Sequence, residues 1–367
     1  MKRTIAFIGL ALLSFGAFAQ YKQDPRLEEV ANFGESQPIG LSVSKENRVF
    51  VSFPRREPYT VGLSEIVDGE RRPYPDAAWN AKEGAPDAHF VNVQDLYVDG
   101  NDQLWVLDAK PSSAGSVFGD DGSGARSLGQ FKLLQIDLAT DRVVRQYTFD
   151  DVDKAKSGLN DVRVDTEKGL AYLSDPGQAG IVVLNLSTGK SRLVLAGSAF
   201  TTAEADVVLH YEGRDMRDGQ GKPFRSNVNG IALTHDNAYF YFKPINTKKL
   251  YRIATTYLAD SALTEAQLVT KVEDMGETAI THGLLADAAG NVYLTASLDY
   301  SIKRFTPAGK METLVQDPRI IWPDSMGIGS DGYLYFSCAQ LNRLPQWTGG
   351  KDEVAYPFAV YRVKIDN

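Results

Sequence analysis

The stretch LNDVRVDTEKGLAYLSDPGQAGIVVLNLSTGKSRLVL, residues 159–195, decides the fold. Polar and apolar residues alternate on both sides of the turn DTEKG, and two further strand-like runs flank the turn NLSTGK. A period of two with Asp, Asn or Gly at the turn is typical of a β-hairpin. The stretch therefore predicts four consecutive antiparallel strands.

Five other segments of the chain repeat the first hairpin of this pattern. They begin at Pro38, Val93, Val228, Thr281 and Pro323 and read PIGLSVSKENRVFVSF, VQDLYVDGNDQLWVLDA, VNGIALTHDNAYFYF, THGLLADAAGNVYLTAS and PDSMGIGSDGYLYFSCA. Self-similar segments at intervals of 42 to 69 residues indicate a repeat architecture. Because a four-stranded antiparallel unit is a propeller blade, the sequence predicts an all-β, six-bladed β-propeller.

The two ends of the chain suggest how the ring closes. The sixth repeat supplies a hairpin at Met326–Cys338 and a third strand at Ala359–Ile365, after which the chain ends. A strand-like stretch, Leu27–Phe33, precedes the first repeat. We expect this N-terminal strand to complete the sixth blade, because an unpaired strand edge would invite aggregation.

The N-terminus has the pattern of a secretory signal peptide. Lys2 and Arg3 precede an apolar run, Ile5–Phe15, which is followed by small residues up to Ala19. The run is too short for a membrane span of roughly 20 residues. We expect cleavage after Ala19, a single propeller domain over residues 20–367, and a secreted or periplasmic monomer without membrane insertion.

The charge and the cysteine content exclude several classes of partner. The formal charge is −8 and becomes −10 once Lys2 and Arg3 are removed. An acidic surface argues against nucleic acid, whose phosphates call for clustered cations. The only cysteine, Cys338, cannot form an internal disulfide, and its apolar neighbours predict a buried core thiol.

The sequence resembles the bacterial form of the Yellow / major royal jelly protein family. The resemblance is carried by the opening stretch extended by one residue (GLNDVRVD), by NGIALTHDNAYFYFKPINTKKLYRI and by WPDSMGIGSDGYLYFSCAQLNRL, and it covers roughly Pro38 to Ile365. It implies a secreted six-bladed propeller, with roles that range from dopachrome conversion to amine binding and nutrition. The cysteine pairs of animal members are absent, so their disulfides do not carry over.

A looser similarity connects the chain to gluconolactonase and senescence-marker propellers, which are metal-dependent lactone hydrolases. Their channel cation is held at the starts of inner strands, including an Asn-Gly and a Pro-Asp-Gly; here Asn229-Gly230 and Pro323-Asp324-Ser325 stand in similar places. Two positions differ. Gln37 is the nearest residue to the metal-binding Glu of the first blade, and His282 stands in the blade where the Asp would be.

The entry ends of the six inner strands are candidate ligand and metal sites, because in a propeller they point at one central channel. The repeats align Gln37, Gln94 or Asp95, Asn160 or Asp161, Asn229, His282 and Asp324 at these ends. Converging polar groups need partners, and oxygen donors suit Ca²⁺ or another divalent cation. A ligand or metal, ordered water alone, and misaligned repeats remain the alternatives.

These positions give a set of predicted roles. We predict proton transfer by His282, His89 and Asp324; ligand contacts by Gln94, Asp95, Asn160, Asn229 and Trp322; and metal coordination by Asn160, Asn229 and Asp324. Trp322 is included because it precedes Asp324 and could stack on a ligand. Asp108 and Asp175 are expected to cap turns, and His210 and His235 to lie at the surface.

Long insertions and one helical segment complete the prediction. The loops 54–92, 109–130 and 197–226 are irregular by composition, and we expect the first and third to cover a binding site. Tyr257–Gln267 predicts a short helical turn capped by Ser261 or Thr264.

Three functions remain open at this stage. No G-x-S-x-G elbow, Gly-rich phosphate loop, H-E-x-x-H or cysteine-based zinc spacing occurs. The first function is binding or tautomerase-like conversion of a small organic molecule in the channel. The second is a metal-dependent lactonase or esterase, and the third is a non-catalytic protein-binding propeller.

Overall fold

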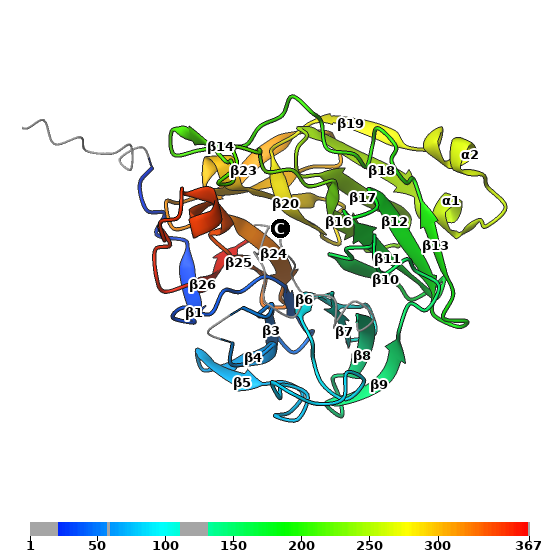
Figure 1. Cartoon of the computed structure of the whole chain (residues 1–367), viewed down its shortest axis with the longest axis horizontal. Coiled ribbons are helices and arrows are strands. Elements are labelled where there is room, and N and C mark those ends of the chain that lie inside the picture. Colours follow the sequence, from blue (N-terminus) through cyan, green and yellow to red (C-terminus); the bar gives the residue numbers. More distant parts are fainter. Residues whose placement is uncertain (1–20, 57–58, 111–130, 366–367) are drawn as a thin grey trace, which may run out of the picture.

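Six four-stranded antiparallel sheets surround a central channel in the computed structural model, which describes residues 21–56, 59–110 and 131–365 (Figure 1). The predicted signal peptide and most of the insertion 109–130 lie outside the described residues. Each sheet is one blade, and its strands follow one another in sequence from the channel outwards in the first five blades. The all-β six-bladed propeller is confirmed.

The first three blades match the first three repeats. Their strands are β2 (Leu41–Val43), β3 (Val49–Ser52), β4 (Leu63–Val67) and β5 (Glu70–Pro73) in blade one; β6 (Val93–Val98), β7 (Gln103–Asp108), β8 (Lys132–Asp137) and β9 (Arg142–Tyr147) in blade two; and β10 (Val162–Asp165), β11 (Leu170–Asp175), β12 (Gly180–Asn185) and β13 (Ser191–Val194) in blade three.

The last three blades follow the same order until the final strand. Their strands are β16 (Val228–Leu233), β17 (Tyr239–Pro244), β18 (Lys249–Ala254) and β19 (Glu273–Glu277) in blade four; β20 (Thr281–Ala286), β21 (Val292–Ala296), β22 (Ser301–Phe305) and β23 (Met311–Gln316) in blade five; and β24 (Pro323–Ile328), β25 (Tyr333–Cys338), β26 (Ala359–Lys364) and β1 (Glu28–Asn32) in blade six. The first strands contact each other in the closed order β2, β6, β10, β16, β20, β24 and back to β2.

The N-terminal strand closes the ring as predicted. β1 pairs antiparallel with β26, from Glu28 opposite Arg362 to Asn32 opposite Ala359 (Figure 1). Blade six thus takes its outer strand from one end of the chain and its other three from the opposite end. Separating them would open the ring, so the closure couples the two termini to the stability of the whole fold.

Apolar side chains between neighbouring blades form the core. Between blades three and four, for example, the ring centroids of Tyr172 and Phe240 lie 5.2 Å apart. Cys338 is buried in the cluster of blade six, and burial raises the pKa of its thiol. The thiol is therefore a core group, as expected.

The remaining elements are short. They are the helices α1 (Thr255–Ala259) and α2 (Glu265–Val269), the hairpin β14 (His210–Tyr211) with β15 (Arg214–Asp215), and the 3₁₀ turns η2 (Ser297–Asp299), η3 (Leu341–Arg343) and η4 (Pro345–Trp347). The single helical turn predicted over 257–267 is in fact two helices, because Asp260 ends the first in an extended conformation. Thr264, one of the two proposed caps, begins the second with a capping box. None of the helices in the described part of the chain is long and apolar enough to span a membrane.

Candidate functional site

The entry ends of the inner strands are irregular, and the irregularity brings their polar residues together. In blades two, four, five and six the pairing register shifts near the aligned polar residue, for example between Val93 and Asp95. A bulge re-aims the side chains beside it. In blades one, three, five and six, a hydroxyl group on the second strand accepts a hydrogen bond from a backbone N–H group at the entry end of the inner strand. The donors and acceptors are Gly40 and Ser52, Asp161 and Ser174, His282 and Thr295, and Ser325 and Ser337.

Two glycines allow neighbouring inner strands to approach closely at this end. A Cβ atom on Gly230 would lie 2.8 Å from the carbonyl oxygen of His282, and one on Gly283 would lie 2.0 Å from that of Asp324. No side chain fits at such distances. The glycines therefore draw blades four, five and six together around the entry half of the channel, which we define as the side where the inner strands begin.

Three carboxylates lie in the entry half, near enough for the charge of Asp95 to act on the other two. Asp95 is the third residue of β6, Asp161 lies just before β10, and Asp324 is the second residue of β24. Burial and mutual repulsion raise the pKa of Asp161 well above its usual value, and burial followed by the charge of Asp95 raises the pKa of Asp324 to about 7. Burial also raises the pKa of Asp95, against the opposing charge of Arg163.

A single guanidinium, Arg163, crosses the channel beneath these carboxylates. Its Nη1 donates to Asp95 Oδ2 at 3.1 Å and to the carbonyl oxygen of Val162 at 2.6 Å, and its Nη2 donates to the carbonyl oxygen of Leu284 in blade five at 3.1 Å. Ser325 of blade six contacts the other oxygen of Asp95 at 3.4 Å. Arg163 thus joins blades two, three and five and separates the entry half from the half beyond it.

Two of the predicted amides join this network, and a third lies apart from it. Gln94 Nε2 donates to Asn160 Oδ1 at 3.2 Å, and Asn160 Nδ2 donates to Asp161 Oδ1 at 2.7 Å. Asn229 Nδ2 instead contacts Ser226 Oγ at 3.5 Å. Asn160, Asn229 and Asp324 are partly exposed, so the channel reaches them.

His282 and Trp322 form a buried pair beside the carboxylates. Their rings stack with centroids 3.8 Å apart, both residues are 1% exposed, and Trp322 Nε1 donates to Asp324 Oδ2 at 3.2 Å. Tyr211 of the loop 197–226 packs on Trp322 and contacts His282, and it donates or accepts a 2.7 Å bond with Ser297. Tyr211 of that loop thus covers the pair formed by His282 and Trp322.

This packing argues against two of the predicted roles. Trp322 has no exposed ring face for a ligand; it orients Asp324 instead. Burial lowers the pKa of His282 to about 3, so its ring is neutral near pH 7 and has no solvent contact through which to exchange a proton. Neither burial could be foreseen from the repeats, because the covering tyrosine comes from a loop without a repeat partner.

His89 and the other predicted residues lie elsewhere. His89 Nδ1 contacts the carbonyl oxygen of Ala85 at 2.7 Å inside the loop 54–92, and its role in proton transfer stays a prediction. Asp175 accepts the backbone N–H groups of residues 158 and 178, which confirms it as a turn cap, whereas Asp108 accepts those of the distant residues 91 and 92 and forms a buried ion pair with Lys132. His210 and His235 are exposed, as expected.

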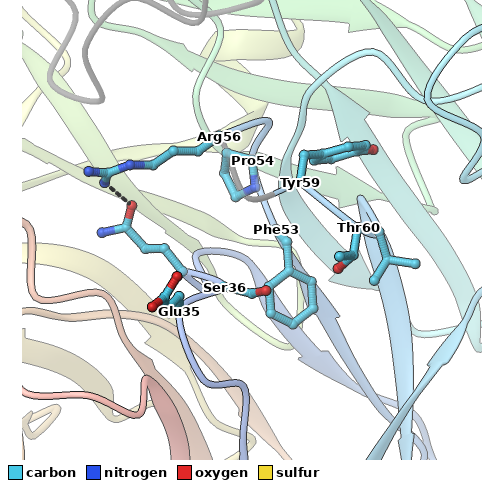
Figure 2. A pocket seen from close by; sticks show the side chains of 9 residues that line it. Glu35, Ser36, Phe53, Pro54, Arg56, Tyr59 and Thr60 are labelled. Carbon is cyan, nitrogen blue, oxygen red and sulfur yellow. Dashed lines mark hydrogen bonds between the residues drawn. The ribbon is translucent and has the colours of Figure 1, made fainter.

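Gln37 is held by the loop 54–92 through Arg56, which is labelled in Figure 2. Its amide nitrogen donates to the carbonyl oxygen of Ala339, and its Oε1 accepts a 3.0 Å bond from Arg56 Nη1. A cavity of about 10 Å³ beside it has room for one water molecule. Gln37 is the residue nearest to the position of the metal-binding Glu in the lactonase pattern. Its side-chain oxygen already accepts a hydrogen bond from the Arg56 guanidinium.

Metal coordination by Asn160, Asn229 and Asp324 stays a prediction, and their present contacts do not favour it. Among residues 21–56, 59–110 and 131–365, no three His, Cys, Asp or Glu side chains lie close enough to hold a metal ion. Gln94 occupies Asn160 Oδ1, and Asn229 bonds to Ser226 rather than towards Asp324. Arg163 bonds to Asp95 and Arg56 bonds to Gln37, so two of the aligned positions already have a cation as partner, and the donor set suits a divalent ion poorly.

The opposite half of the channel is open. A cavity of about 370 Å³ is lined by the ends of all six inner strands, including Val43, Leu96, Arg163, Leu233, Leu285 and Met326. We call it the exit cavity. Arg163 belongs to its lining, so the same side chain borders both halves.

Comparison with known proteins places the chain in a family. The family model described as Major royal jelly protein matches residues 91–365. A search of curated proteins finds no match.

Solved structures share the fold at low sequence identity. Regucalcin from Agrobacterium tumefaciens, titled a calcium-binding protein, is 12% identical, covers 92% of this chain and 93% of its own, and has a TM-score of 0.57. A gluconolactonase from Xanthomonas campestris is 11% identical over 93% of this chain and 89% of its own, with a TM-score of 0.54. An inactive virginiamycin B lyase from Staphylococcus aureus with quinupristin is 12% identical over 92% and 99%, with a TM-score of 0.50. At these identities the likeness is one of fold.

Proposed function

This chain belongs to the major royal jelly protein family, and from that membership and the channel geometry we propose that it binds a small, amine-bearing organic molecule in the entry half of the channel. We further propose that Asp324 moves a proton on the bound molecule, as a tautomerase would. The signal-like N-terminus supports a secreted or periplasmic location for this activity.

The observation that carries the proposal is the excess of carboxylates in the entry half. Burial raises the pKa of Asp95, Asp161 and Asp324, the charge of Asp95 raises the pKa of the other two further, and Arg163 opposes the shift at Asp95 and Asp161. A protonated amine would supply a second positive charge and charge-assisted hydrogen bonds to carboxylate oxygens. The partly exposed Asn160 can present its side-chain amide to the same ligand.

Asp324 has the properties of a proton-transfer group. Its pKa of about 7 leaves both protonation states populated near neutral pH, which suits general acid–base catalysis. Trp322 holds Oδ2, and Oδ1 has no hydrogen-bond partner within the described part of the chain. The carboxyl group can therefore be oriented by one oxygen and exchange a proton through the other.

Calorimetric titration with tryptamine and its uncharged analogue tryptophol tests the binding step. We expect tryptamine to bind at least 10-fold more tightly, and Asp161→Asn to remove most of that preference while leaving the affinity for tryptophol unchanged. Equal affinities for the two compounds in the wild-type protein would contradict the proposal.

Dopachrome conversion followed by absorbance tests the proton transfer. Asp324→Asn keeps the shape and the Trp322 contact but cannot carry the proton, so we expect conversion to fall by a factor of about 10²–10⁴. Absent conversion in the wild type would leave a binding protein without this activity, and unchanged conversion in the variant would show that Asp324 does not move the proton.

A metal-dependent lactonase is the less favoured function, because the donor set suits a divalent ion poorly. Lactone hydrolysis measured before and after exhaustive dialysis against a chelator decides the matter. Hydrolysis that chelation abolishes and Ca²⁺ restores would reverse this preference.

A further inference from the structure

The exit cavity lies at the opposite end of the channel from the proposed amine site. Its volume, about 370 Å³, is within the range of roughly 300–1,000 Å³ that small-molecule sites occupy. It is formed by the later residues of the inner strands and the turns that follow them, whereas Asp95, Asp161 and Asp324 lie at or just before the strand starts. The two sites therefore share strands but no carboxylate.

The wall of the exit cavity is mainly apolar. Val43, Leu96, Leu233 and Met326 are buried in it, and Leu285 is half-buried. Tyr97 adds an aromatic ring to the lining, with the guanidinium carbon of Arg163 5.4 Å from its centroid. A concave apolar wall with one aromatic ring suits a ligand that is itself largely apolar and cyclic.

The acidic residues in the lining are committed to neighbouring turns. Asp99 accepts bonds from the backbone of residues 101 and 103 and from Trp105 Nε1. Asp287 accepts bonds from the backbone of residues 289 and 291 and from Asn291 and Tyr293 side chains. Lys45 Nζ donates to the carbonyl oxygen of Gly100 at 2.7 Å. These groups hold the rim, and the acids there disfavour an anionic ligand.

Arg163 is the polar group that the cavity leaves unsatisfied. The residue is 5% exposed, its two terminal nitrogens bond to Asp95, Val162 and Leu284, and its Nε–H has no acceptor among the described residues. Buried donors are normally paired with protein or with a bound molecule. Nε itself is shielded from solvent, but Arg163 belongs to the lining of a mainly apolar cavity, so a ligand that brings its own acceptor suits this part of the wall.

We propose that the exit cavity is a second binding site, which takes an uncharged, ring-containing apolar molecule whose carbonyl oxygen is directed towards Arg163. The volume of the cavity limits the size of the ligand, and its apolar wall favours an apolar ligand. Arg163 favours a ligand with a hydrogen-bond acceptor. This proposal does not depend on the amine site, because Arg163 separates the two halves and no carboxylate of the entry half lines the cavity.

Equilibrium dialysis with three matched naphthalenes tests the ligand class. We expect 2-acetylnaphthalene, which has a carbonyl acceptor, to bind at least 10-fold more tightly than 2-ethylnaphthalene, which has none, and more tightly than the anion 2-naphthoate. No binding of the acetyl compound, equal binding of the first two, or tightest binding of the anion would overturn the proposal.

Two leucine variants test the location. Leu285→Trp fills part of the cavity and should weaken 2-acetylnaphthalene binding at least 10-fold, while tryptamine binding stays unchanged. Leu193→Trp is the matched control, because Leu193 is 37% exposed on β13, an outer strand, and lies outside the cavity lining. Unchanged binding in Leu285→Trp, with thermal unfolding that shows a folded protein, would overturn the location.

Discussion

The entry and exit halves of the channel are built from the same six strands and differ in what those strands carry. In the entry half, polar side chains of different blades bond to one another, and Tyr211 covers the pair formed by His282 and Trp322. In the exit half, apolar side chains surround open space, and the one buried cation has an unpaired N–H. The backbone is a common frame, and the function of each half depends on a few positions per strand.

The boundary between the halves is the Asp95–Arg163 ion pair. It is fully enclosed, with side chains 2% and 6% exposed. An ion pair removed from water is worth little against an apolar pair of the same size, but breaking it by removing one partner is costly. The strongest way to test the contrast between the halves is therefore to remove one member of this pair.

Asp95→Ala should have the largest effect on stability. It leaves the Arg163 guanidinium buried without its carboxylate, so we expect the free energy of unfolding, measured in urea, to fall by about 3–5 kcal/mol. The double variant Asp95→Leu with Arg163→Leu should recover most of the loss. A loss below about 1 kcal/mol in the single variant would mean that water reaches the guanidinium and that the two halves are continuous.

The exposed pair Lys156–Asp153 is the control for that measurement. Lys156 Nζ lies 3.1 Å from Asp153 Oδ2, the same distance as in the buried pair, but the side chains of Lys156 and Asp153 are 75% and 45% exposed. Asp153→Ala should change the free energy of unfolding by less than about 1 kcal/mol.

The sequence was sufficient for the fold because each blade is encoded locally. The alternation and turns of residues 159–195 recur in every blade, and β1 fills the position that the sixth repeat leaves open. The helical segment was placed less well, since Leu258 and Leu268 each anchor a separate helix to the core, and that packing has no sequence period.

The candidate site was only partly accessible from the sequence. Aligning the repeats brought Gln94, Asn160 and Asp324 to the same end of the channel, as the structure has them, because their position in the strand is local information. It did not reveal that Arg163 reaches blade five, since a period of two gives the side of a strand but not how far a long side chain extends. The sequence did contain one sign of this role: Arg163 is charged at a position where other repeats have Ser42, Ala232 or Gly327.

Gly283→Ala should disturb the entry half but not the exit half, and its effect on stability should be smaller than that of Asp95→Ala. Its Cβ would lie 2.0 Å from the carbonyl oxygen of Asp324, so β20 and β24 must separate. We expect a loss of about 1–3 kcal/mol in the free energy of unfolding and weaker tryptamine binding, with 2-acetylnaphthalene binding retained. Gly219→Ala, whose Cβ meets nothing within 4 Å, should be nearly neutral in all three measurements.

The smallest predicted effect is a difference in pH dependence between ligand binding in the entry half and ligand binding in the exit half. The pKa of Asp324 is about 7, raised by burial, so the protonated carboxyl stabilises the fold at low pH and that contribution is lost as pH rises through 7. Tryptamine remains protonated over this range, so its affinity should increase several-fold from pH 6 to pH 8 as the carboxylate forms. 2-Acetylnaphthalene binding should stay constant.

Asp324→Asn provides the control for this last comparison, because an amide has no proton to lose near pH 7. In the variant the tryptamine affinity should be independent of pH between 6 and 8, and the unfolding free energy should lose about 1–2 kcal/mol of pH dependence, a value reduced for the partial exposure of the group. If the wild-type affinity for tryptamine is equally flat, the group that titrates in the entry half does not contact the amine. If the affinity for 2-acetylnaphthalene changes in parallel, Arg163 transmits the charge state of one half to the other, and the two halves act as one coupled site.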